Sequence, residues 1–234
     1  MMKMYPILIK LLSPFFNYCK VTNGGALTSD FIGDIALTYA LNRVLKQKNF
    51  YSGLGEKKGP NYSELRKLDY FFSVGKPISS NLTGIYTRNT LFNVDGGPDY
   101  DVLISRTGQS ARFPMGKTLF KNYFKVQGIK AESTFSSFLF TRNKFEIEFP
   151  ITVRIGTGRE TLTILELNSG IENTDDEIWL NAFSIKTVFG DLVFRNFLKK
   201  ISDYHLDYKL ENYLLIKKIN IDQVKALFKE CFDD

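Results

Sequence analysis

The 234-residue sequence has little of the chemistry on which most catalytic and metal sites depend. Its single histidine, His205, excludes metal centres built on several histidines and leaves one imidazole for acid–base work. Its two cysteines, Cys19 and Cys231, are far apart in the chain and too few for a disulfide framework, which is typical of a protein of the reducing cytoplasm. No serine stands in a nucleophile-elbow motif. We therefore expect no metal site and no catalytic residue.

The sequence also lacks a long uninterrupted apolar run. A helix that spans a membrane needs about 20 consecutive apolar residues, whereas the longest candidate, residues 5–16, is broken by Lys10 and Pro14. Apolar residues stand at alternate positions in this run, which predicts a first β-strand and not a signal peptide. We expect no membrane partner.

Positive charge is in moderate excess. The chain has 31 lysines and arginines against 25 acidic residues, which gives a formal net charge of +6 and favours encounter with a polyanion. With 44% hydrophobic residues it is long enough to form one substantial core. We expect a single α+β domain over residues 1–234.

Aromatic and cationic residues are interleaved at strand-like spacing in residues 78–142. Rings can stack on unpaired bases while ammonium and guanidinium groups hold phosphates, so this composition indicates a surface for single-stranded nucleic acid. The turn Asp95–Pro98 separates two strand-like runs, which predicts a hairpin inserted at about residues 78–142. An ordinary β-rich core with solvated cations on its outer face is the alternative. The candidate binding residues here are Tyr86, Arg88, Arg106, Arg112, Lys117, Lys121 and Lys125.

Two amphipathic helices are predicted. The first has Thr28 or Ser29 as its cap, and Gly33 in its first turn indicates close approach by another backbone or by a ligand, unless it is merely tolerated near a helix end. The second begins at Asp222 and places Cys231 on its buried side. The apolar faces of the two helices consist of Ile32, Ile35, Ala36, Tyr39, Ala40 and Val44, and of Val224, Leu227, Phe228 and Cys231.

A glycine turn follows the most regular strand pattern in the chain, at residues 145–155. Gly156 and Gly158 are most simply explained by a hairpin, but their amides and the flanking Arg154 and Arg159 could equally hold a phosphate. The turn lacks the spacing and the following helix of a Rossmann or Walker loop, so we expect no cofactor.

At the opening of the chain, a threonine-containing loop at Gly24–Thr28 leads into the predicted helix at Phe31–Leu41, which has an early glycine. This opening resembles the Cas protein family numbered five, whose members are subunits of type I CRISPR effector (Cascade) complexes and have such a loop and helix. The Tyr39–Leu41 stretch, and Val153–Gly156 followed by a basic turn, are most similar to the type I-D variety.

This resemblance implies a ferredoxin-like, RNA-recognition-motif type fold with a long β-hairpin thumb. It also implies a cytoplasmic protein that caps the 5′ handle of the guide RNA, contacts the repeated backbone subunit and the large subunit, and meets target DNA only indirectly. The family's glycine-rich loop often lies nearer the C-terminus than the one here. The residues that the resemblance places at the RNA are Thr28 and Gly33 at the helix start, and Arg154, Gly156, Gly158 and Arg159 beside the glycine turn.

Three functions are therefore considered. The first is a non-catalytic subunit that binds guide RNA. The second is a metal-independent endoribonuclease in which His205, with a nearby tyrosine or lysine, activates a 2′-hydroxyl, although a lone histidine in a strand-like run is typical of a structural role. The third is a purely structural assembly protein whose aromatic residues pack on partners.

Overall fold

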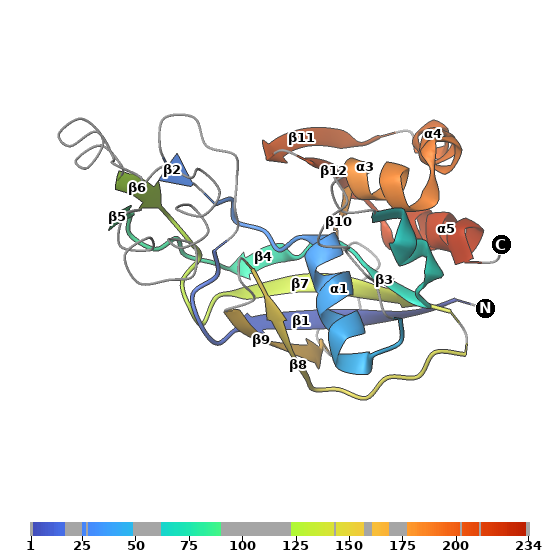
Figure 1. Ribbon diagram of the computed structural model, residues 1–234. Helices are drawn as coiled ribbons and strands as arrows, with labels where there is room; N and C mark the ends of the chain where they lie inside the picture. The colour runs from blue at the N-terminus through green and yellow to red at the C-terminus, as the bar shows by residue number, and fades with distance from the viewer. Residues whose placement is uncertain are drawn as a thin grey trace, which may run out of the picture.

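The computed structural model describes residues 2–16, 25–26, 28–48, 62–89, 123–142, 144–156, 161–168, 177–201, 203–210 and 212–232. In these ranges the chain forms one large antiparallel sheet, two three-stranded sheets and several helices (Figure 1). A mixed α and β architecture is thereby confirmed. No helix among the described residues has the length and apolar character needed to cross a membrane.

The large sheet, which we call the central sheet, has the strand order β3-β7-β1-β9-β8, and β4 also pairs with β7. Its first strand lies in the middle, where Ile7, Ile9 and Leu11 are fully buried and the residues between them are partly exposed. The strand predicted from this alternation is confirmed. The strands of the central sheet are β1 (Lys3–Leu11), β3 (Tyr70–Phe72), β4 (Lys76–Ser79), β7 (Thr134–Thr141), β8 (Ile151–Ile155) and β9 (Thr161–Leu167).

Helix α1 (Asp34–Leu45) lies across one face of the central sheet (Figure 1). It connects β1 to β3, which run in the same direction with β7 between them, so this part is a split β-α-β unit. A ferredoxin-like domain has a second helix after its third strand. Among the described residues between β7 and β9 there is a strand, β8, and no helix, so a ferredoxin-like fold is not confirmed.

Helix α1 begins later than its predicted cap at Thr28 or Ser29. Its N-cap is Gly33 in an extended conformation. The chain stays extended up to this point because Ile32 and Gly75 exchange two backbone hydrogen bonds, of 2.8 and 3.1 Å. Val44 was placed on the buried face but is 47% exposed, because it lies in the last turn of the helix.

Strand β7 lies within the segment 78–142 that was predicted to form an inserted hairpin. It pairs with β1 over eight residues, and its Phe135, Phe138 and Phe140 are buried in the core. For this part of the segment the alternative of an ordinary β-rich core is correct, because these rings fill the interior. The thumb expected in the rest of the segment stays a prediction, since residues 90–122 lie outside the described ranges.

The strand pattern at residues 145–155 forms a ladder only over β8. The preceding residues Phe145 and Phe149 are half-buried and pack their rings against Tyr70 and Tyr5, at centroid distances of 4.9 and 6.2 Å. Their alternation therefore reflects packing on the core by a segment outside the ladder. Strands β8 and β9 form the predicted hairpin, with Ile155 paired to Thr161.

The C-terminal helix α5 (Ile221–Phe232) closes the far side of the core. The Phe228 ring stacks on Phe140 at a centroid distance of 4.1 Å, and Val224, Leu227 and Cys231 are buried beside it. The apolar spacing that predicted this helix is confirmed.

A second sheet, the C-terminal sheet, has the order β10-β12-β11. The carbonyl of Trp179 accepts a 2.9 Å hydrogen bond from the Val74 amide, and Phe31, Val74 and Leu215 form a small buried cluster there. The elements of this region are β10 (Ile178–Asn181), α3 (Ala182–Ser184), the π-helical turn η3 (Ile185–Phe189), α4 (Asp191–Lys200), β11 (His205–Leu210) and β12 (Tyr213–Ile219), and the 3₁₀ helix η1 (Tyr62–Lys67) packs against η3.

Candidate nucleic-acid interface

The third sheet contains three of the residues predicted to bind RNA. We call it the arm sheet; it consists of β2 (Gly25–Ala26), β5 (Tyr86–Asn89) and β6 (Tyr123–Val126), and it lies beyond one end of the central sheet (Figure 1). Strand β6 is in the middle, parallel to β2 and antiparallel to β5. Tyr86 and Arg88 lie in β5 and Lys125 in β6, with Lys125 opposite both Thr87 and Gly25. The fold thus brings Tyr86, Arg88 and Lys125 into one ladder.

The base of the arm sheet is tied together by Thr83. Its amide donates to the Gly128 carbonyl at 2.8 Å, and its hydroxyl accepts a 2.9 Å hydrogen bond from the Gly128 amide. The Gln127 side chain donates to the Thr83 carbonyl at 3.1 Å. Because Thr83 is buried, this pairing of the strand that enters the arm with the strand that leaves it is shielded from water.

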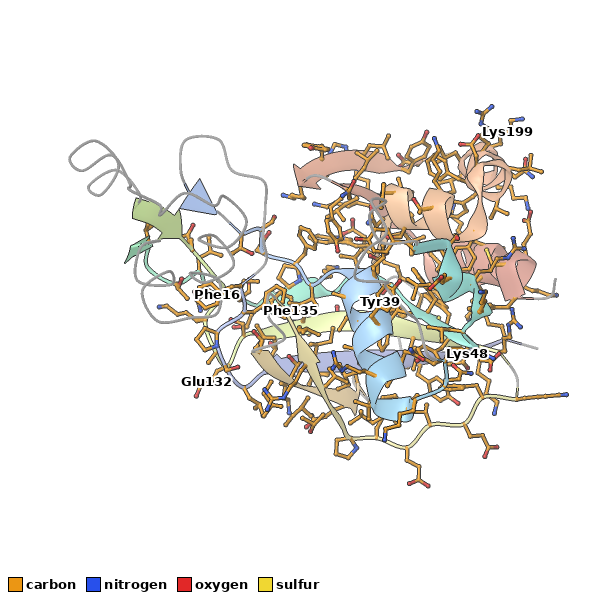
Figure 2. The ribbon with its side chains drawn as sticks, viewed as in Figure 1. Phe16, Tyr39, Lys48, Glu132, Phe135 and Lys199 are labelled. Carbon is orange, nitrogen blue, oxygen red and sulfur yellow. The ribbon has the colours of Figure 1, made fainter. Side chains whose placement is uncertain are left out.

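Gly128 at the base of the arm sheet and Gly156 at the end of β8 both lie against the short segment Phe15–Phe16. A Cβ on Gly128 would lie 2.6 Å from the Phe15 carbonyl oxygen and 2.7 Å from the Phe16 ring. Gly156 has φ +79°, and a Cβ there would lie 3.1 Å from both the Phe15 ring and the Phe16 carbonyl oxygen. Figure 2 shows Phe16 at the end of the core that faces the arm sheet. The predicted glycine turn therefore adjoins the base of the arm.

Arg154 projects from the outer face of β8, two residues before Gly156. Strand β8 alternates between buried and exposed residues, with Val153 in the core and Thr152 and Arg154 in solvent. Arg154 is therefore exposed at the end of β8 that leads into the glycine turn. An exposed guanidinium beside a turn is well suited to contact a phosphate.

Thr28 and Gly33 are both buried, at the approach to α1. The Thr28 hydroxyl donates to the Ser29 carbonyl at 3.3 Å. A Cβ on Gly33 would lie 2.1 Å from the hydroxyl oxygen of Tyr213 in β12. The sequence indicated close approach by another backbone or by a ligand, whereas the group that approaches is this tyrosine side chain. A role of either residue in RNA binding stays a prediction.

A buried carboxylate next to Gly33 was not anticipated from the sequence. Asp34 is 2% exposed, and its Oδ1 accepts a 2.8 Å hydrogen bond from the Ile35 amide. The side chains of Ser184 and Asn181 also hydrogen-bond to it, and Asn181 donates to the Ser184 hydroxyl at 2.8 Å. Burial raises the pKa of Asp34 from 3.8 to about 6, and these hydrogen bonds oppose the shift. The start of α1 is thereby joined to α3 and the C-terminal sheet.

The match to a protein family decides the identity. The family model of the Type I-D CRISPR-associated protein Cas5/Csc1 matches residues 2–229. The chain belongs to this family. The resemblance to the Cas family numbered five and to its type I-D variety is confirmed, and the Cas5 family acts within CRISPR effector complexes with RNA.

Solved structures of low similarity to this Cas5/Csc1 chain were also found. One is a chain of the type III-B Cmr-beta complex bound to cognate target RNA and AMPPnP, with a TM-score of 0.36 and 14% identity over 97% of this chain and 93% of that one. Another comes from Cmr-beta bound to cognate target RNA, with a TM-score of 0.35, 14% identity, and coverage of 97% and 94%. No curated protein matches the chain.

Six of the predicted RNA-binding residues of this Cas5/Csc1 chain lie outside the described ranges, namely Arg106, Arg112, Lys117, Lys121, Gly158 and Arg159. His205, the histidine of the ribonuclease hypothesis, is exposed on β11 and pairs in the ladder with Lys217. Within the described ranges, no three histidine, cysteine or acidic side chains come together as ligands for a metal ion.

Proposed function

We propose that this chain is a non-catalytic subunit of a type I-D CRISPR effector complex that binds the 5′ handle of the guide RNA. The observation that carries the proposal is the arm sheet, which places Tyr86, Arg88 and Lys125 in one ladder of a Cas5/Csc1 family member. An aromatic residue and cations on neighbouring strands form a combination that suits unpaired nucleotides, because a ring can stack on a base while cations contact phosphates.

The β8–β9 turn extends this binding surface. Gly156 and the arm base both contact Phe15 and Phe16, so the two sites meet at one end of the core. In our proposal the phosphates of the handle run along the arm sheet and reach Arg154 beside the turn. The chain also contacts the repeated backbone subunit and the large subunit, and it meets target DNA only through the guide.

A binding measurement with the purified protein tests the proposal. The probe is RNA with the 5′-handle sequence of the CRISPR repeat, and an RNA of scrambled sequence is the reference. We expect the double variant Arg88→Ala/Lys125→Ala to bind the handle at least about tenfold more weakly, since a hydrogen bond to a charged group is worth about 1.5–3 kcal/mol. Each lost phosphate contact should also reduce the salt slope by about 0.7.

Lys199→Ala is the matched control. Lys199 is an exposed cation on α4, and Figure 2 shows it at the opposite end of the molecule from Phe16 and the arm. This variant should bind as the wild type does. If the double variant retains wild-type affinity and salt slope, the RNA does not lie on the arm sheet and the proposal is wrong.

A further inference from the structure

Strand β11 is an edge strand of the C-terminal sheet. Figure 1 shows it at the outer margin of the molecule, with β12 between it and β10. Among the described residues it pairs with β12 alone, from His205 opposite Lys217 to Leu210 opposite Tyr213. The ladder holds β11 extended, so the backbone groups on its other side are already aligned for a further strand.

An apolar row crosses this sheet and ends uncovered at the edge. Leu180 of β10 lies opposite Ile216 of β12, which lies opposite Leu206 of β11. Leu180 and Ile216 are buried, whereas Leu206 is 43% exposed and Tyr208, two residues further on the same face, is 70% exposed. An apolar side chain of an added strand, placed next to Leu206, would extend this row and cover the exposed part of Leu206.

The other face of the edge carries an excess of positive charge. The Asp207 carboxylate contacts the ammonium groups of Lys217 and Lys209, at 2.6 and 3.2 Å. One carboxylate balances one of the two lysines, so a positive charge remains beside the edge. A second copy of this chain would bring two such clusters together and is disfavoured, whereas a strand with a carboxylate next to Lys209 would be favoured.

We propose that β11 is the docking site for an extended segment of another protein subunit, which adds to the C-terminal sheet as a fourth strand. The segment has apolar residues at alternate positions, against Leu206 and Tyr208, and an acidic residue beside Lys209. Main-chain hydrogen bonds along β11 supply much of the affinity, and these side-chain contacts supply the specificity. This site is distinct from the arm sheet and does not involve RNA.

The test uses the assembled effector complex with its guide RNA, which rests on the proposed function. Amide hydrogen exchange is compared between the free protein and the complex. We expect those amides of residues 205–209 that point away from β12 to exchange at least about tenfold more slowly in the complex, because strand addition protects edge amides. Assembly with one protein subunit omitted at a time shows which subunit supplies the strand.

Variants of the edge provide the second measurement. Leu206→Lys/Tyr208→Lys should reduce incorporation of this chain into the complex by at least about tenfold, since it places charge in the apolar row. Leu192→Lys is the matched control, because Leu192 is 72% exposed on α4 and is not part of the edge. It should assemble as the wild type does.

The outcomes separate this proposal from the proposed function. The edge variant should bind the 5′-handle RNA with wild-type affinity, and a failure of the wild-type protein to bind that RNA would contradict only the proposed function. Unchanged exchange at residues 205–209 on assembly would overturn the docking proposal. So would protection of these amides in the free protein on dimerisation, which would assign the edge to a second copy.

Discussion

The hydroxyl group of Tyr213 occupies the space in which a side chain at Gly33 would lie. The distance from its oxygen to a Cβ built on Gly33 is only 2.1 Å, and the Tyr213 ring also packs on Phe31 at a centroid distance of 4.9 Å. A residue of β12 is thus fitted against the N-cap of α1. The glycine is required by this contact and not by its backbone conformation, because its φ is −69°.

Gly33→Ala should therefore destabilise the protein by about 1–3 kcal/mol, the usual effect of overpacking a tight contact. Urea unfolding would measure it. In the background Tyr213→Ala the clash is absent, so the same substitution should cost much less. Equal costs in the two backgrounds would show that Tyr213 is not the obstacle.

The buried carboxylate of Asp34 should make stability depend on pH. Its pKa is raised to about 6 from 3.8, so the folded state binds this proton more tightly than the unfolded state does. The resulting stabilisation is complete below pH 3.8 and is lost as the pH rises through about 6, and the shift corresponds to about 3 kcal/mol. Urea unfolding of the wild type from pH 4 to 8 would be compared with that of Asp34→Asn, which should lack this component, each measured at matched ionic strength. A variant with the slope of the wild type would exclude Asp34 as its source.

The local patterns of the sequence predicted β1, the β8–β9 hairpin and α5. In β1 the buried residues Ile7, Ile9 and Leu11 recur at every second position, the period of a strand. In α5 the buried residues Val224, Leu227 and Phe228 recur at the three- and four-residue spacing of a helix. Aromatic content alone did not predict that Phe138 of β7 is buried in the core whereas Tyr86 lies in the arm sheet. Both residues belong to the segment 78–142 in which aromatic and cationic residues are interleaved, and strand pairing distinguishes them.

The environment of α1 was beyond prediction for another reason. Gly33 and Asp34 contact Tyr213 and Ser184, residues far away in the sequence, and no periodic pattern reports such pairs. One local feature of the sequence does accompany the burial of Asp34, namely an acidic residue at the beginning of the apolar face of the helix. Because the helix cap was predicted at Thr28 or Ser29, Asp34 was not expected to be the first residue of the helix.

Arg154→Ala should weaken binding of the 5′-handle RNA by about 1.5–3 kcal/mol and leave the melting temperature unchanged, because an exposed cation contributes little to stability. Thr152→Ala, on the same exposed face of β8, is the control and should change neither quantity. Wild-type affinity in the arginine variant would remove the glycine turn from the RNA site.

His205→Ala should leave guide RNA processing intact. The histidine is exposed on β11, and general acid–base catalysis requires partner groups within hydrogen-bond reach of the reacting atoms. Repeat RNA incubated with either protein in the absence of metal ions should be recovered uncut. A specific product formed by the wild type and lost in the folded variant would establish the endoribonuclease hypothesis instead.

The position of β1 at the middle of the central sheet has a consequence for biosynthesis. It is synthesised before both of its neighbours, β7 and β9, where Ile7 pairs with Ser137 and Leu167. Until both of these strands have been synthesised, β1 has two open edges and an uncovered row of Ile7, Ile9 and Leu11. Long-range pairing of this kind is slow and leaves a nascent chain prone to aggregation. Strand β1 therefore stays incompletely paired until the chain has been synthesised as far as β9, and a chaperone that covers it during translation would protect the nascent chain from aggregation.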